Sequence, residues 1–506
     1  MDTVHESADS SAGAARSQDL IDPGGVFGRC ISMDLWKNNL DVFREQNPWW
    51  VSGAVPVDLV GSVRRLYYDH IAEHLATQRE VLLLEGPRRV GKTTLIYQAI
   101  AHLLASATPP SRILYVSVDD PYLNRGTLFK DIQDYFEHFA AKRDLRGAEG
   151  TFYVFLDEVT ALDDWELYVK RYYDLKYPLR FVCTSSAAAF LKKRSRESLA
   201  GRISAVQVYP FCLSEAASLR GMGSKLAEAH ALIRETWASF YKHLDVTRLH
   251  AGLQEVEKEF GTLLLDELPL RLYLLEGGFP EYILAKSPRY KDHYFLESVV
   301  DRTLFHDIGP VFGATDLHLL QRLFLYANNQ SGALLNVSEA SRNLGAPYST
   351  VAGYLRSLSS AGLLYLLSKF ATSVEAEARS IERVYAIDPG LYLSLARVEP
   401  TDLDQTGGWG RLAEICVFGE FKRHDLRDIR YWRDREREVD FVVDCAGALL
   451  AIDVKFRDDP LDPRGLRGLE QFTRRFSPAV RIIVSKDTHR LCDDRTLVVP
   501  LRLFLG

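Results

Sequence analysis

Residues 86–93 read GPRRVGKT, which is the G-x-x-x-x-G-K-T pattern of a phosphate-binding loop. The apolar run at residues 81–84 before it predicts a buried parallel strand. Residues 94–100 after it space their apolar side chains for one buried face of a helix. A chance match inside a glycine-containing turn would lack these neighbours, so the context favours an anion-binding loop.

The residue types in this loop suit a triphosphate. Gly86 and Gly91 carry no Cβ, so the backbone can wrap closely around an anion. The loop N–H groups and the positive end of the following helix would point at phosphate oxygens. Lys92 can reach the β- and γ-phosphates, and the Thr93 hydroxyl can ligate Mg²⁺. We therefore expect ATP as the ligand, with Mg²⁺.

A second motif lies at residues 151–158, where a predicted strand ends in two carboxylates. This is the Walker B pattern, in which Asp157 would hold Mg²⁺ through water and Glu158 would polarise the attacking water. A strand followed by an acidic helix cap is the alternative interpretation. The phosphate loop upstream favours the functional one.

Two further candidates follow. The predicted strand at residues 180–186 ends in hydroxyls, and Ser185 or Ser186 is expected to face the γ-phosphate. Arg202 could stabilise charge on the transferring phosphoryl group, on its own nucleotide or on a neighbour's, or it could be a surface arginine in a turn. The expected nucleotide-binding residues are Gly86, Pro87, Arg88, Arg89, Val90, Gly91, Lys92, Thr93, Thr94, Asp157 and Ser185.

Composition narrows the class of protein. Of the 506 residues, 47% are hydrophobic and 26% are charged, which is ordinary for a globular protein of several domains. Because the formal net charge is -6, the molecule as a whole is not a polycation, and any surface that binds nucleic acid must be a local patch. The six cysteines are scattered without a C-x-x-C pair, which argues against a zinc site or a disulfide framework. We expect no membrane span and no signal peptide, and therefore a cytoplasmic protein.

The order of the motifs resembles the bacterial and archaeal AAA-type ATPases whose C-terminal half is domain of unknown function 4143. The motifs are GPRRVGKTT, FLDEV, TSS, LAGR and VYPFCLSE, followed by GGFPE at residues 277–281 and by Asp301, Arg302 and Asp307. The resemblance covers about residues 60–490 and implies an ATPase core, a winged helix and a nuclease-like domain. The charged helical stretch at residues 218–265 matches none of the motifs and is interpreted as a variable lid.

The predicted winged helix leaves two roles open. Residues 338–345 are expected to form the positioning helix and turn, and a second helix should begin at Ser349. A DNA reader normally carries basic or amide side chains on its recognition helix. Packing or dimerisation is therefore an alternative to DNA binding, because this helix offers mainly hydroxyls: Tyr348, Ser349, Thr350, Tyr354 and Arg356.

The last domain resembles the PD-(D/E)xK nuclease fold in its order of helix, three strands, helix and strand. The resemblance implies that Asp440, Asp453 and Glu414 hold Mg²⁺ or Mn²⁺, and that Lys455 orients or activates water. Asp453 and Lys455 are two residues apart on a strand, so both side chains should emerge on one face. Ordinary strand-end charges are the alternative, and a domain that binds without cleaving is the alternative to a nuclease.

The sequence therefore predicts an α/β chain: a P-loop NTPase (AAA-like) parallel sheet, a helical lid and linker, a winged helix, and a C-terminal nuclease-like α/β domain. ATP, DNA and a second copy of the chain are the expected partners. The predicted boundaries are a disordered tail (1–25), a helical segment (26–76), the ATPase core (77–212), the lid and linker (213–310), the winged helix (311–372), a connector (373–409) and the nuclease-like domain (410–506).

Overall fold

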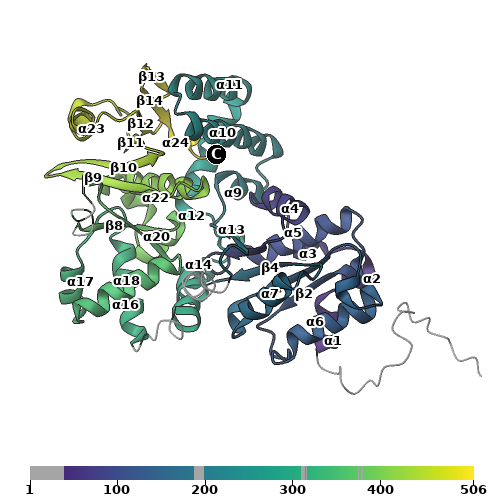
Figure 1. Cartoon of the computed structure of the whole chain (residues 1–506). Coiled ribbons are helices and arrows are strands. Elements are labelled where there is room, and N and C mark those ends of the chain that lie inside the picture. Colours follow the sequence, from purple (N-terminus) through teal and green to yellow (C-terminus); the bar gives the residue numbers. More distant parts are fainter. Residues whose placement is uncertain are drawn as a thin grey trace, which may run out of the picture.

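The computed structural model describes residues 39–186, 199–308, 314, 316–373, 375, 377 and 380–506. The predicted tail at residues 1–25 lies outside the described residues. Figure 1 shows two sheets at separate ends of the molecule, joined by helices. Within the described ranges, no helix is both long and apolar enough to cross a bilayer.

The first sheet is parallel throughout, with strand order β2-β3-β4-β1-β5. Its side chains alternate between two cores, because successive residues of a strand point to opposite faces. Leu82 and Leu84 pack with α5, whereas Leu83 packs on the other face with Trp165 of α7. This arrangement confirms the predicted parallel α/β core. Its strands are β1 (Val81–Glu85), β2 (Ile113–Ser117), β3 (Phe152–Asp157), β4 (Leu179–Ser185) and β5 (Ile203–Gln207).

Helices cover both faces of this sheet, and a purple N-terminal segment lies against it in Figure 1. That segment is anchored on β2, since the Trp50 indole donates to the Ile113 carbonyl at 2.8 Å. The helices are α1 (Asn39–Gln46), α2 (Trp49–Ser52), α3 (Val57–Val60), α4 (Tyr68–Thr77), α5 (Lys92–Ala105), α6 (Leu128–Tyr135) and α7 (Trp165–Asp174).

The unmatched stretch at residues 218–265 is a helical hairpin of α10 and α11. The apolar faces of its two helices pack on each other, and α10 also binds the end of the chain, because the Trp237 indole donates to the Leu503 carbonyl at 2.7 Å. The helices of this region are α9 (Leu213–Leu219), α10 (Ser224–His243), α11 (Val246–Leu264), α12 (Glu267–Glu276), α13 (Pro280–Leu284) and α14 (Pro288–His293), followed by π-helical turns at Tyr294–Asp301 and Thr303–Ile308.

The segment predicted as a winged helix contains three helices and part of a small antiparallel sheet of order β6-β8-β7. Its central strand, β8, comes from the segment predicted as a connector, so the sheet is completed by residues beyond 372. The elements are α16 (Leu317–Asn329), β6 (Leu334–Leu335), α17 (Val337–Leu344), α18 (Tyr348–Ser360), β7 (Leu364–Leu367), β8 (Glu382–Ala386), α20 (Pro389–Ala396) and α21 (Leu403–Thr406).

The C-terminal sheet is mixed, with order β13-β14-β12-β11-β10-β9, and lies between α22 and α23. The predicted order of helix, three strands, helix and strand is found, and two strands and a short helix follow it. The elements are α22 (Gly408–Arg423), β9 (Ile429–Asp434), β10 (Arg437–Cys445), β11 (Ala448–Lys455), α23 (Pro463–Phe476), β12 (Val480–Ser485), β13 (Arg490–Asp493), β14 (Thr496–Pro500) and α24 (Leu501–Phe504).

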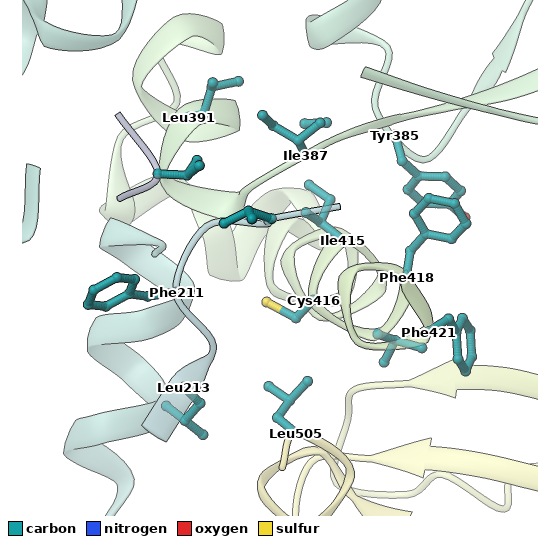
Figure 2. Packing of buried hydrophobic residues seen from close by; sticks show 14 of the residues in the cluster. Phe211, Leu213, Tyr385, Ile387, Leu391, Ile415, Cys416, Phe418, Phe421 and Leu505 are labelled. Atoms are coloured by element: carbon teal, nitrogen blue, oxygen red, sulfur yellow. The ribbon is translucent and has the colours of Figure 1, made fainter. Parts of the chain in front are cut away.

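One apolar core runs from the first sheet to the second. Figure 2 shows its middle, where Leu213, Cys416 of α22 and Leu505 near the end of the chain lie close together, whereas the Phe211 ring points away from Cys416. The Phe211 N–H donates to the Gly278 carbonyl at 2.7 Å. A Cβ on Gly278 would stand 2.1 Å from the Phe211 carbonyl oxygen, so this close approach requires glycine.

Candidate nucleotide site and C-terminal carboxylate cluster

The phosphate loop leaves β1 and enters α5 as the sequence predicts. A Cβ on Gly86 would stand 2.2 Å from the Val208 carbonyl oxygen, so the loop passes too close to the end of β5 for any side chain. The Lys92 ammonium donates to the carbonyls of Gly86 and Pro87, both at 2.9 Å. Lys92 therefore lies across the loop, with its charge at the place where phosphate oxygens would enter.

The two Walker motifs meet at one contact. The Thr93 hydroxyl donates to Asp157 Oδ2 at 2.7 Å, which joins the start of α5 to the end of β3. The buried Tyr115 hydroxyl donates to the same oxygen at 3.1 Å. These hard oxygens fit the ligands that Mg²⁺ prefers, so Thr93 and Asp157 are the residues that would hold it.

Thr184 is the polar residue of β4 that contacts the Walker B motif. Its hydroxyl donates to Asp157 Oδ1 and accepts the Glu158 N–H at 2.9 Å. Ser185 is fully buried, and its carbonyl accepts the Gly86 N–H at 3.2 Å. That Ser185 or Ser186 faces the γ-phosphate stays a prediction.

A cavity of about 430 Å³ opens beside the loop. Lys92, Thr93 and Glu158 line it from the ATPase core, and Glu281 and Arg302 line it from the helical region. The sequence motifs at residues 277–281 and 301–307 contained these last two residues but gave them no role. The cavity therefore has walls from two parts of the chain.

The loop is held by residues on both sides. Arg89 forms an ion pair with Glu281 of α13, across the cavity wall. Arg65, which is 2% exposed, donates to the Val90 carbonyl and pairs with Glu215 of α9 at 2.8 Å. Sequence reasoning missed Arg65 because no motif surrounds it.

Arg202 does not join this site in its own chain. Its carbonyl accepts the Val81 N–H at 2.8 Å, at the start of β1, whereas the phosphate loop follows the end of that strand. A five-residue strand separates the two places by roughly 15 Å. Its guanidinium pairs with Asp174 at 2.7 Å. The cis alternative is therefore wrong, and action on a neighbour's nucleotide stays a prediction, as does the homo-oligomer that it needs.

The C-terminal domain brings Glu414, Asp440, Asp453 and Lys455 together as the sequence predicts. Lys455 Nζ lies 2.9 Å from Asp453 Oδ2 and 3.8 Å from Asp440 Oδ2. A fifth residue, Arg383 of β8, lies among them, with Nη1 at 3.3 Å from Asp440 Oδ1. Among the residues described, no group of three or more His, Cys, Asp and Glu side chains is arranged to hold a metal ion.

Burial and charge set the ionisation of this cluster. Burial and the neighbouring Asp440 charge raise the pKa of Glu414 to about 8, and they do the same for the pKa of Asp453. Burial opposes ionisation of Asp440 too, but the charges of Lys455 and Arg383 hold its pKa below the usual value. The charged form of Asp440 is thus stabilised by two side-chain cations of this chain.

Comparisons with known protein families match three parts of the chain. Three family models match: an AAA domain (AAA_14) at residues 78–217, a domain of unknown function (DUF8612) at residues 268–402, and domain of unknown function DUF4143 at residues 409–504. The chain has an AAA-type P-loop ATPase-like fold and ends in DUF4143, which is the architecture that the motifs implied.

Relatives of similar layout occur in bacteria and archaea. An uncharacterized protein of Haemophilus influenzae is 22% identical over 381 residues, which cover 74% of this chain and 82% of that protein. Protein MJ1637 of Methanocaldococcus jannaschii is 24% identical over 328 residues, covering 63% of this chain and 64% of that protein. Among solved structures, the Walker-type ATPase PABY2304 of Pyrococcus abyssi is similar with a TM-score of 0.35 and 20% identity, covering 66% and 96% of the two chains.

Proposed function

We propose that this protein binds and hydrolyses ATP, and that the bound nucleotide controls how its C-terminal half packs. The observation that carries the proposal is the hydrogen bond between Thr93 and Asp157, beside Lys92 and Glu158, at the wall of one cavity. In P-loop enzymes, catalysis is mainly positioning and charge stabilisation of the phosphates. These four side chains supply the functions that such a site needs.

Each residue has a role in this proposal. Lys92 and the loop N–H groups bind the phosphates, and Glu158 orients the attacking water. Thr184 fixes Asp157 and the Glu158 backbone with one hydroxyl. Mg²⁺, when bound at Thr93 and Asp157, supplies charge that neutralises the phosphates. Arg302, which lines the cavity from the helical region, supplies a further positive charge.

Contacts between the loop and later parts of the chain support control by the nucleotide. Gly362, directly after α18, lies so near the loop that an added Cβ would stand 3.8 Å from the Pro87 ring. Arg89 pairs with Glu281 on the other side of the loop. A change in the loop on nucleotide binding or hydrolysis would therefore act directly on both neighbouring segments.

Phosphate release measured with purified protein tests the hydrolysis. We expect Lys92→Ala to abolish ATP binding, and Glu158→Gln to keep binding but lose about 100-fold or more in turnover. Lys130→Ala is a matched control, because Lys130 is an exposed lysine that pairs with Asp134 on α6. Equal turnover in all four proteins would contradict the proposal.

Two roles were predicted for the C-terminal domain, a metal-dependent nuclease and a domain that does not cleave. We propose the second, because Arg383 lies against the carboxylates that a metal would need. The exposed Arg356 is the only charged residue of α18, so the helix gives DNA little to bind electrostatically. That DNA is a partner stays a prediction.

A further inference from the structure

Arg383 enters the carboxylate cluster from outside the C-terminal domain. It lies on β8, the central strand of the small sheet, and only 3% of it is exposed. Its Nη2 lies 2.8 Å from Glu438 Oε2, and its Nη1 lies 3.3 Å from Asp440 Oδ1. The guanidinium also lies over the Tyr431 ring at 5.1 Å. This side chain is thus held by two carboxylates and an aromatic face, all from the C-terminal sheet.

Both oxygens of Asp440 are already engaged. Oδ1 faces Arg383, and Oδ2 accepts the Val454 N–H at 2.9 Å and lies 3.8 Å from the Lys455 ammonium. Asp453, which is fully buried, faces Lys455 at 2.9 Å. The two acidic residues that would form a metal site therefore already face two cationic side chains, Arg383 and Lys455.

Glu414 belongs to the same network through a hydroxyl. The Tyr385 hydroxyl donates to Glu414 Oε2 at 3.1 Å and accepts from Arg383 Nη1 at 3.4 Å. A divalent cation entering among these carboxylates would lie close to a guanidinium and an ammonium, both in a poorly hydrated place where like charges repel strongly. The carboxylates are suitable ligands for such an ion, but the positive charges of Arg383 and Lys455 disfavour its binding.

The packing around β8 keeps Arg383 in place. The Tyr385 ring stacks on Phe418 of α22 with centroids 5.1 Å apart, and both rings lie against Phe441 of β10. The Phe370 N–H donates to the Tyr431 carbonyl at 2.6 Å, which ties the end of the small sheet to β9. Moving Arg383 out would require this shared core to open.

We propose that Arg383 and Lys455 occupy the place of a divalent cation, so that the cluster is an ion-pair junction between β8 and the C-terminal sheet and not a metal-dependent catalytic centre. The junction stabilises the buried Asp440 carboxylate with two cationic side chains of the same chain. It fixes the DUF8612 region on the DUF4143 domain. This inference does not depend on the nucleotide site and can fail or hold independently of ATP hydrolysis.

Binding of Mn²⁺ to the nucleotide-free full-length protein, followed by the electron paramagnetic resonance signal of the free ion, tests the proposal. Every protein carries Asp157→Asn, which removes the ligand expected at the nucleotide site. We expect the parent and its Asp453→Asn derivative to bind the same amount of Mn²⁺. Arg383→Met should bind one Mn²⁺ ion more per chain than the parent, because the substitution removes a positive charge and keeps the bulk. Adding Asp453→Asn to Arg383→Met should abolish that gain.

Two results would overturn the proposal. One is a Mn²⁺ ion bound by the parent and lost in Asp453→Asn, or DNA cleavage by the parent that Asp453→Asn abolishes. The other is a folded Arg383→Met protein, judged by circular dichroism, that binds no more Mn²⁺ than the parent. If Arg383→Met does not fold, the comparison of the parent with Asp453→Asn still decides.

Discussion

Thr184 uses one hydroxyl for two hydrogen bonds, and both go to the end of β3. It donates to Asp157 Oδ1 and accepts from the Glu158 backbone, so it fixes the Asp157 carboxylate and the base of the Glu158 side chain together. The Glu158 backbone has a positive φ of 54°, a conformation that favours glycine. One hydroxyl thus helps to position the two residues to which we assign metal binding and orientation of water.

Replacing this hydroxyl gives a prediction at the residue scale. Thr184→Val keeps the shape but removes the hydrogen bond from Thr184 to Asp157 Oδ1, and hydrogen bonds to charged groups contribute about 1.5–3 kcal/mol. We expect ATP turnover to fall by about 10- to 100-fold, measured as phosphate release. Thr184→Ser keeps the hydroxyl and should stay within about threefold of the wild type. Turnover unchanged in Thr184→Val would mean that Thr184 only fills space.

At the scale of elements, the α10–α11 hairpin fastens the end of the chain. His230 Nδ1 donates to the Leu505 carbonyl at 2.8 Å, about two helical turns before Trp237 binds Leu503. Burial lowers the pKa of His230 to about 4, although the Leu505 carbonyl opposes this shift and Arg234 adds to it. The contact of the hairpin with the end of the chain therefore depends on pH.

This pKa predicts how stability changes with acidity. Between pH 6.5 and about 4 the unfolded chain binds the His230 proton and the folded chain does not, so stability is complete above pH 6.5 and falls as pH falls. His230→Asn keeps an N–H donor but cannot bind this proton. We expect its free energy of unfolding to fall by about 2 kcal/mol less than that of the wild type between neutral pH and about pH 5. Urea denaturation at both pH values measures it, and equal losses would contradict the assignment.

At the scale of the whole molecule, the nucleotide cavity and the C-terminal half share a continuous framework. The Phe211 carbonyl accepts from the Tyr273 hydroxyl at 3.0 Å and from Arg423 of α22 at 3.3 Å, and the Phe211 N–H donates to the Gly278 carbonyl. Arg423 also pairs with Glu420 at 3.0 Å. Three regions that are far apart in the sequence therefore meet at one backbone segment.

We expect the Arg89–Glu281 ion pair to transmit nucleotide binding from the phosphate loop to the helical region. Hydrogen exchange over residues 277–302 is expected to slow when a non-hydrolysable ATP analogue binds, because Glu281 and Arg302 line the cavity. Glu281→Gln should reduce that protection by about two- to fivefold, since partly exposed ion pairs contribute at most about 1 kcal/mol. Glu297→Gln is the control, because Glu297 lies in the same region but is 70% exposed and faces His293. Protection that is identical in all three proteins would contradict the role of the pair.

Much of this architecture could be predicted because it depends on local patterns. The strands β1, β3 and β4 are apolar runs with polar ends, and the loop between β1 and α5 carries a motif with a fixed geometry. The resemblance to a family supplied the order of elements in the C-terminal domain. Strand alternation placed Asp453 and Lys455 on one face, and the structure has them 2.9 Å apart.

The residues that were missed are those whose partners are distant in the sequence. Arg383 meets Asp440 across 57 positions, and Arg65 meets Glu215 across 150, so no local spacing could indicate either pair. Helical periodicity predicts that α10 is a helix but not that it covers the C-terminal residues. Arg202 was predicted to lie at the nucleotide because its neighbours matched a motif. It comes just before β5, which runs parallel to β1, so it lies at the opposite end of the strands from the phosphate loop.

The core around Phe211 has a practical consequence for anyone who wants to study the pieces separately. A fragment ending after the AAA match at residue 217 would expose Leu213, which in the intact chain lies near Leu505, and would leave the Phe211 backbone without its hydrogen bonds to Gly278, Tyr273 and Arg423. An exposed apolar surface of this kind promotes self-association in solution. Biochemical dissection is therefore better done with point substitutions in the intact polypeptide than by cutting it at the borders that family matches suggest.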